Sequence, residues 1–342
     1  MAVAGATGII TSEELADNAV TTNKLTNDAV TTDKLIDDAV TNPKILDQTI
    51  ANDKLANPAR KNLIINGDMR IAQRGTSADG TSAYLLDRFK KQVGGTPANG
   101  TISQDTDTPD GFQNSQKATF SGAATFYQTG QQIEFVNFSH LLGASVTASV
   151  YYKSDVDITL RIRHNTTSTD GTCLFGGTGS SVLSDTTLSA SASWTRATHT
   201  FTINASSVAI SLEFGTGALV SGNDIWITGV QLEAGSTASD FEHLNITEQI
   251  QLCKRYFQIS SFGSDWNGND FFGGSVQHAM RATPSTSNVT YDLSSNINTG
   301  NGVNGLNTGV GTSTKDYTQW QFARSAGSRA YAWGYFHLSS EL

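Results

Sequence analysis

The chain has 342 residues, of which 37% are hydrophobic and only 15% charged, with 32 glycines and a formal net charge of −9. At about 100 to 200 residues per domain, this length predicts two or three folded units. Charged residues usually make up about 25% of a soluble protein. Thr, Ser, Asn and Gly take their place here, a composition that favours strands and turns and predicts a mostly β protein.

Charge and cysteine content exclude several classes of function. The sequence pI near 5.1 argues against nucleic acid as a partner, because phosphate binding needs a basic surface. Residues 1–8 carry no Lys or Arg, so we expect no secretory signal, and no stretch reaches the about 20 apolar residues of a membrane span. Cys173, Cys253 and the scattered histidines do not have zinc-ligand spacing. We expect a soluble protein without membrane insertion, bound metal or cofactor.

A ten-residue repeat runs through residues 14 to 58, with a large apolar residue at every fifth position. These residues are Leu15, Val20, Leu25, Val30, Leu35, Val40, Ile45, Ile50 and Leu55. On a continuous helix this spacing sends successive apolar residues to different faces, and on a strand it alternates between faces. It predicts short helical turns capped by Thr22, Thr32 and Asn42, with Thr11 and Glu14 as a capping box at the first.

Each repeat offers too few apolar residues for a core within one chain. Several identical chains winding together would bury them, so we expect a thin multimeric stem. A disordered acidic linker is the alternative, supported by the Asp and Asn content. Repeats of the form D-A-V-T-T-x-K-L, as at residues 28–35, resemble those of bacteriophage fibres and head-fibre bases. The resemblance implies a homotrimer.

Two segments are expected to open and close a middle domain over residues 59–244. The first, residues 61–75, contains N-L-I-I-N-G-D, and the second spans residues 226–242. They resemble the ends of sandwich domains in phage tail-fibre proteins, and the opening is similar to jelly-roll carbohydrate-binding modules. Between them, apolar and polar residues alternate at 147–152, 158–163 and 208–214, which indicates half-buried antiparallel strands. A jelly-roll β-sandwich is predicted.

An acidic run within this domain holds Asp105, Asp107 and Asp110. Its spacing misses that of a calcium-binding loop by one position, so a turn is predicted there.

Residues 245–342 are predicted to form one amphipathic helix and a small C-terminal β domain. Asn245 and Glu248 indicate a helix start, after which Ile246, Ile250, Cys253 and Phe257 share an apolar face. Cys253 is therefore expected to be a buried hydrophobe and not a reactive thiol. Residues 250–258 resemble a helix that separates the sandwich from a distal β domain in phage fibres. Strands are expected at about 274–282, 287–293, 317–324 and 329–338, with a polar loop over residues 296–313.

The receptor-binding residues are expected in this C-terminal part, because a fibre tethered at its N-terminus projects its other end outward. The candidates for stacking on sugar rings are Trp266, Phe271, Phe272, Trp320, Tyr331, Trp333 and Tyr335. Alternation puts the last three on one face of the final strand. The alternative is that these aromatics form the core of a small domain or a trimer interface, which is the commoner role for a single aromatic residue.

The leading functional hypothesis is a non-enzymatic tail fibre located in the virion. No nucleophile elbow, phosphate-binding loop or catalytic carboxylate pair can be identified from the sequence. Residues 1–58 would be the anchor and stem, contacting other virion proteins through residues 1–20, while the distal part binds a host-surface glycan or protein. A capsid-mounted head fibre and a glycan-depolymerising tail spike are the alternatives.

Overall fold

The structure of the protein is a computed structural model. It describes residues 60–79, 82–95, 99–266, 280–281, 289–292, 307–313, 318–323 and 330–341, together with residues 21, 25, 30 and 31. Side chains are described as far as residue 259, except at 82 and 83, and again at 280, 281, 340 and 341. The chain divides into two compact units, Met1–Ala59 and Arg60–Leu342. The predicted boundaries at residues 58 and 244 stay predictions, and the capped turns of the stem lie outside the described residues.

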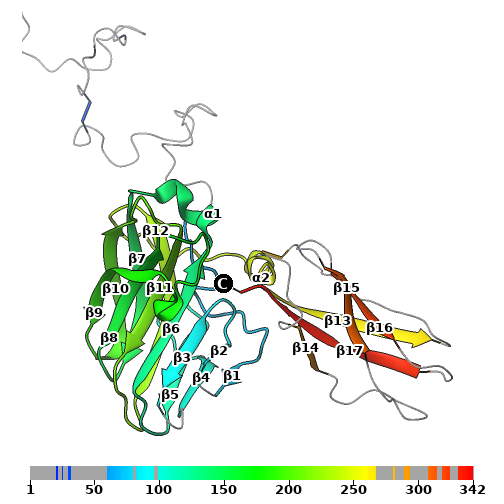
Figure 1. Cartoon of the computed structure of the whole chain (residues 1–342). Coiled ribbons are helices and arrows are strands. Elements are labelled where there is room, and N and C mark those ends of the chain that lie inside the picture. The colour runs from blue at the N-terminus through cyan, green and yellow to red at the C-terminus, as the bar shows by residue number, and fades with distance from the viewer. Residues whose placement is uncertain are drawn as a thin grey trace, which may run out of the picture. The chain divides into compact units, whose positions relative to one another are not determined.

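Two antiparallel sheets dominate the described part of the second unit, with six strands each (Figure 1). Sheet A has the order β1 (Ser77–Ala78), β4 (Gly100–Asp105), β5 (Ser115–Phe120), β12 (Asp224–Ala234), β7 (Ser145–Ser154), β10 (Ser191–Thr202). Sheet B has the order β2 (Ser82–Tyr84), β3 (Lys90–Gly94), β6 (Phe126–Ile133), β11 (Ala209–Thr216), β8 (Ile158–Asn165), β9 (Ser180–Leu188). A short helix, α1 (Phe135–Phe138), and 3-10 turns at Ser139–Leu141 and Leu174–Gly176 complete this region. The predicted β-rich sandwich is confirmed.

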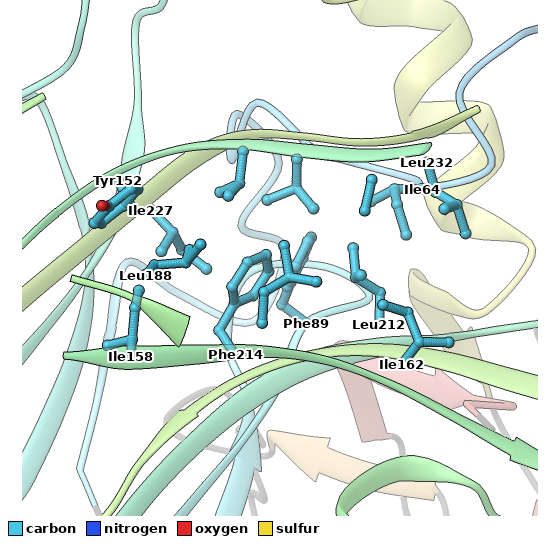
Figure 2. Close-up of a cluster of buried hydrophobic side chains, with 14 of the residues drawn as sticks. Ile64, Phe89, Tyr152, Ile158, Ile162, Leu188, Leu212, Phe214, Ile227 and Leu232 are labelled. Atoms are coloured by element: carbon cyan, nitrogen blue, oxygen red, sulfur yellow. The ribbon is translucent and has the colours of Figure 1, made fainter. Parts of the chain in front are cut away.

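The main core lies between the two sheets. Figure 2 shows Tyr152 and Ile227 of sheet A directed toward Ile158 and Phe214 of sheet B. All four side chains are buried. Burying a side chain of this size contributes about 1.5–3 kcal/mol, so the sandwich is held mainly by contacts between its sheets.

The predicted alternation holds along β8, where Ile158, Leu160 and Ile162 are buried and the residues between them are partly exposed. The expectation of a half-buried strand is wrong for β11, because Ser211 and Glu213 on its other side are buried as well. The cause is the segment at residues 170–176, which covers that side. A strand covered on both faces cannot be distinguished from a half-exposed one by local pattern alone.

The opening and closing segments of the sandwich hydrogen-bond to each other. Leu63 N donates to Leu232 O at 2.9 Å, and Asn62 Nδ2 donates to Val230 O at 3.1 Å. Gly67 follows in the same motif, and a Cβ at this position would lie 2.1 Å from the oxygen of Val230. The N-G-D sequence therefore has a steric reason, since only glycine lets the two backbones approach this closely.

Asn66, next to this glycine, has a left-handed backbone with φ of 61°. Its side-chain amide donates to Ile71 O at 2.9 Å and to Asp87 O at 3.1 Å, and its Oδ1 accepts from Ile71 N at 2.9 Å. Asn tolerates left-handed backbone better than most residues because its side chain bonds nearby backbone groups. The side chain of Asn66 thus holds the loop through Ile71 against the backbone of Asp87.

The predicted helix is α2 (Ile246–Lys254), with the side chain of Asn245 accepting from Thr247 N at 2.8 Å as its N-cap. Cys253 is fully buried, as predicted, and packs with Ile65 and Ile71 of the opening segment. Ile246 is 42% exposed, so its expected place on the apolar face is wrong. Ile246 is the first residue of the helix, and the cluster of Ile65, Ile71 and Cys253 takes in Ile250 and Leu252 but not Ile246.

Phe257 is buried but does not belong to the helix, which corrects a second expectation. The helix ends at Lys254, and Phe257 begins β13 (Phe257–Trp266). Arg255 is the C-cap residue and its guanidinium pairs with Glu134 at 2.8 Å, while Tyr256 O accepts from Ser340 N at 2.8 Å. Tertiary partners thus override the helical periodicity.

The C-terminal strands differ in two places from those expected. β14 (Val289–Asp292), β16 (Thr318–Ala323) and β17 (Ala330–Ser339) match predicted strands. β13 was not predicted, and β15 (Asn307–Ser313) lies within the expected polar loop. β15 has a single large apolar residue, Val310, and pairs with β16, so long-range pairing and not local pattern forms it. Of the expected strand at 274–282, Met280 and Arg281 are described and are not in a strand.

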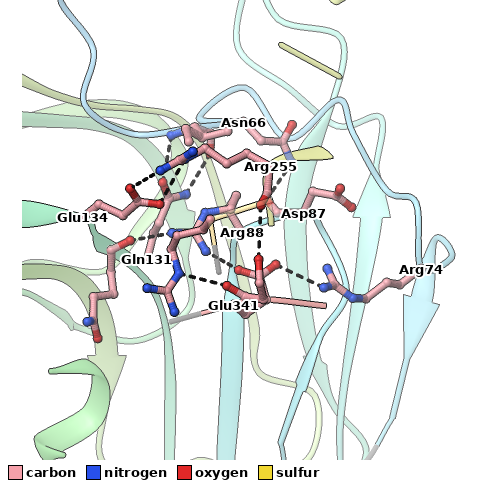
Figure 3. A network of polar contacts seen from close by, with 12 residues as sticks. Asn66, Arg74, Asp87, Arg88, Gln131, Glu134, Arg255 and Glu341 are labelled. Atoms are coloured by element: carbon pink, nitrogen blue, oxygen red, sulfur yellow. Dashed lines mark hydrogen bonds and ion pairs between the residues drawn. The ribbon is translucent and has the colours of Figure 1, made fainter. Parts of the chain in front are cut away.

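A buried ion network joins the end of the chain to the sandwich (Figure 3). Arg88, 2% exposed and with φ of 73°, donates to Glu341 through Nη1, and its Nη2 donates to Gln132 O at 2.6 Å. Arg74 Nη2 lies 3.1 Å from the other oxygen of Glu341. The guanidinium of Arg88 also lies 3.5 Å from the ring centroid of Tyr256. A carboxylate 253 positions away along the chain therefore neutralises a buried cation of the sandwich.

Among the described residues, neither helix has the length and apolar character that crossing a bilayer would require.

Gly67→Ala should lower the free energy of unfolding by about 1–3 kcal/mol, because the new Cβ would collide with the Val230 carbonyl. Gly217→Ala is the matched control, since a Cβ there meets nothing within 4 Å. Urea unfolding followed by circular dichroism measures both. Equal midpoints for the two variants would contradict the close approach.

Glu341→Gln should cost about 3–5 kcal/mol, because it leaves the buried Arg88 guanidinium without its counter-charge. Asp185→Asn is the control: this carboxylate is 47% exposed and 3.5 Å from Arg161, so its loss should cost less than about 1 kcal/mol. Thermal unfolding of both variants, with wild type alongside, gives the comparison. A Glu341→Gln protein as stable as wild type would show that Arg88 does not depend on this carboxylate.

Stability should fall as pH rises from about 4 to about 6. Burial raises the pKa of Asp87 to about 6, although the hydrogen bonds from Gln73 and the charge of Arg74 oppose this. In this window the folded state keeps a proton that the unfolded state has lost, so stability decreases with pH by about 3 kcal/mol. Asp87→Asn should remove this contribution. The urea midpoint of each protein is measured between pH 4 and 7. If it changes with pH equally in wild type and variant, Asp87 is not the group responsible.

Candidate functional site

The aromatic residues expected to bind a receptor fall in the C-terminal strands or outside the described residues. Trp266 is the last residue of β13, and Trp320 in β16 pairs with Val310. Phe271 and Phe272 lie outside the described residues. The side chains of the strand residues are likewise outside the described part, so their role stays a prediction.

Tyr331, Trp333 and Tyr335 occupy alternate positions of β17, opposite Asp265, Gly263 and Ser261 of β13. The pairing is continuous over Ala330–Ser339, without a bulge. A continuous register is what the predicted alternation needs. The backbone therefore agrees with the strand on which that prediction was built, while the choice between a binding face and a core stays open.

A different candidate emerges from the outer face of sheet B, the face turned away from the core. One end of this face is closed by the segment at residues 170–176. Glu213 Oε1 accepts from Phe175 N at 2.8 Å, while Gln132 Oε1 accepts from Cys173 N at 2.8 Å. Burial raises the pKa of Glu213, and Arg163 Nε at 3.2 Å opposes that rise. These buried polar groups are satisfied by partners within the chain, so they hold the segment in place.

The other end of this face is open and hollowed. The hollow has a volume of about 230 Å³ and is lined by Gln128, Thr159, Arg161, Gly215, Thr216 and Gly217. Gly215 pairs with Gln128 on β6 and with Thr159 on β8, so the glycine lies between two polar side chains. A Cβ on Gly215 would come within 3.1 Å of Gln128 Cγ. The missing side chain therefore leaves the floor of the hollow open.

Arg161 supplies the charge at this hollow. Its Nε lies 3.5 Å from Asp185 Oδ2, with side-chain exposures of 26% and 47%. That Nε is buried and makes no hydrogen bond within the described part of the chain. A half-exposed pair at this distance is weak, so the guanidinium retains donors for another acceptor.

The hollow thus presents an amide, two hydroxyls and a guanidinium around a backbone floor. Such groups donate to and accept from neighbouring hydroxyls of a polar ligand. Sequence reasoning missed this site. Its lining comes from three separate strands, β6, β8 and β11, which the local sequence pattern does not bring together.

The acidic run is not arranged as an ion-binding loop. Asp107 N donates to Asp105 Oδ1 at 2.7 Å, and Gly111 has φ of 88°, which confirms the predicted turn. Within the described residues, no group of three or more His, Cys, Asp or Glu side chains is placed to hold a metal ion. Both cysteines are free and buried.

Neither a protein-family model nor a curated protein matches the chain. Solved structures with a similar arrangement include the enzymatically active domain of bacteriophage CBA120 tailspike protein 4, at 12% identity and a TM-score of 0.36. That match covers 51% of this chain and 21% of the tailspike chain. A CBM4 protein matches at 17% identity and a TM-score of 0.34, over 50% of this chain and 98% of its own.

The C-terminal family 22 carbohydrate binding module of Clostridium thermocellum Xyn10B matches at 10% identity and a TM-score of 0.32. It covers 50% of this chain and all of its own length, 100%.

Proposed function

We propose that this chain is a non-enzymatic virion fibre protein whose sandwich binds a host-surface glycan in the hollow of sheet B. The observation that carries the glycan-binding part is the open end of the sheet, where Gln128 and Arg161 flank the bare floor at Gly215. Sugars carry hydroxyls in neighbouring pairs. A planar amide and a planar guanidinium each offer paired hydrogen-bonding groups to such hydroxyls.

The site is built on strands and is therefore well ordered. Gln128, Thr159 and Arg161 stand on β6 and β8, which pair with β11 through an unbroken register around Gly215. A preformed site loses little conformational freedom when a ligand binds, so weak individual hydrogen bonds can still produce affinity.

Catalysis is not part of the proposal. Glycoside hydrolysis generally uses two carboxyl groups on either side of the scissile bond, one of them as acid. The lining of the hollow consists of amide, hydroxyl and guanidinium groups with glycine, which hold hydroxyls but do not supply such a pair. A depolymerising tail spike is for this reason the weaker alternative.

The fibre part of the proposal rests on the repeats at residues 14–58. Leu25 and Val30, two of the apolar residues spaced by five, are 48% and 54% exposed in the single chain. Exposed apolar residues at regular intervals favour burial between identical chains. We infer a homotrimer attached to other virion proteins through residues 1–20. A capsid-mounted head fibre is the alternative, and labelling the chain in electron micrographs of the particle distinguishes the two.

Arg161→Ala should weaken glycan binding about tenfold or more, since a charge-assisted hydrogen bond is worth about 1.5–3 kcal/mol. Arg161→Lys keeps the charge without the planar fork and should lose part of the affinity. Thr202→Ala, at an exposed position of sheet A, is the control and should bind as wild type does. Binding is measured on a glycan array and then by calorimetry with the best oligosaccharide.

Unchanged binding by Arg161→Ala, at wild-type melting temperature, would remove the hollow as the binding site. Release of new reducing ends from a bound polysaccharide would move the protein to the class of glycan-cleaving spikes.

A further inference from the structure

The outer face of sheet A, on the opposite side of the sandwich from the hollow, carries a row of alternating cationic and indole side chains. The row is Lys117 on β5, Trp226 on β12, Lys153 on β7 and Trp194 on β10. Trp226 pairs with Lys117 on one side and with Lys153 on the other, so the strand register itself assembles the first three members. We call these four residues the tryptophan row.

Trp194 joins the row through an irregularity in the edge strand. The register between β10 and β7 shifts between Ser191 and Thr195, on either side of Trp194. A bulge of this kind re-aims a side chain, and bulges are frequent at sheet edges and beside functional sites. Trp194 Nε1 donates to Asp107 Oδ1 at 2.9 Å, which fixes the direction of the indole.

The lysines lie against the indoles and not in free solution. Lys153 Nζ lies 4.0 Å from the ring centroid of Trp226 and 5.9 Å from that of Trp194, and Lys117 Nζ lies 4.6 Å from that of Trp226. Cation–π contacts of this length restrict the motion of the rings. Both indoles are nevertheless partly exposed.

The charges of the row are balanced locally. Lys153 donates to Asp107 Oδ2, and Lys117 Nζ lies 3.0 Å from Asp224 Oδ2. Hydrogen bonds from Lys153 and Trp194 lower the pKa of Asp107 below its ordinary value, and an aspartate is in any case ionised at neutral pH. The surface therefore combines fixed aromatic rings with charged hydrogen-bonding groups but has no excess charge.

We propose that the tryptophan row is a second carbohydrate-binding surface, which takes an uncharged pyranose chain by stacking a sugar ring on Trp194, because the two lysines already lie over the ring of Trp226. The apolar C–H face of a pyranose matches an exposed indole, while Asp107 and Lys153 are placed to bond its hydroxyls. Rigid aromatics give contact area at low entropic cost. This rests on the proposed glycan-binding function but not on the hollow, because the two surfaces lie on opposite sheets.

A second copy of the chain is the competing occupant of this face. The observations favour a sugar, because the row is polar at every second position and its charges are satisfied within the chain. A contact between copies would instead favour a contiguous apolar patch without ionised groups at its centre.

The test compares the full-length wild-type chain with Trp194→Ala, Trp194→Phe and Arg161→Ala on one array of neutral and uronate-containing glycans. Calorimetry with the best neutral oligosaccharide follows, and light scattering gives the mass of each protein. Trp194→Ala should lose about tenfold or more in affinity for neutral glycans at unchanged mass. Trp194→Phe, which keeps a stacking ring, should lose much less.

Each outcome separates this proposal from the one for the hollow. Loss of binding in Arg161→Ala with full binding in Trp194→Ala overturns the second surface and leaves the hollow. The reverse result supports the tryptophan row and removes the hollow. A changed mass for Trp194→Ala assigns the face to a contact between copies and overturns the proposal. Failure of the wild-type chain to bind any glycan overturns both.

Discussion

The buried ion pair between Glu341 and Arg88 ties the C-terminal end of the described chain to the sandwich. Arg88 is buried inside the sandwich, and a buried guanidinium requires a counter-charge. Glu341 provides it, and the other oxygen of the same carboxylate pairs with Arg74. The chain must therefore return to the sandwich after its last strands, and Ser340 N bonds Tyr256 O beside the point where β13 begins. β13 and β17 accordingly start and end together, with Phe257 opposite Ser339. The ion pair thus lies beside the end of the strand pair where β13 begins and β17 ends.

The two outer faces of the sandwich carry different kinds of side chains. Sheet B is covered at one end by residues 170–176 and open at the other, so its polar side chains surround a hollow. On the outer face of sheet A, long side chains contact one another, and Lys153 makes cation–π contacts with Trp226 and Trp194. The strand register produces both arrangements, because residues paired across neighbouring strands are held within reach of each other. A rigid core thus supports two differently built surfaces.

Local patterns in the sequence predicted the local features of the fold. The alternation of apolar and polar residues predicted β8, Asn245 predicted the start of the helix, and the N-G-D motif predicted the opening of the sandwich. What the sequence could not give depends on distant partners. β15 exists through its pairing with β16, the second covered face of β11 depends on a loop, and Arg88 meets a residue 253 positions later. The tryptophan row was missed for the same reason: Trp194 and Asp107 are 87 positions apart. The periodicity of apolar residues predicts one helix or strand at a time, whereas these contacts join residues of several elements.

If the two proposed surfaces bind glycans, the charges around them would favour uncharged sugars over acidic ones. The whole chain carries a net charge of −9, and an acidic polymer must approach against it, although salt screens this repulsion beyond about 8 Å. Close to the protein surface, the ion pairs within the chain determine which ligands can bind. Asp107 and Asp224 already neutralise the lysines of the tryptophan row. At the hollow, Asp185 lies 3.5 Å from Arg161 and would repel a ligand carboxylate that approached the same guanidinium. A hydroxyl meets no such repulsion and can accept from the guanidinium while donating to the carboxylate. Discrimination against charged glycans would then come from fixed acidic side chains beside each cation, without any steric barrier.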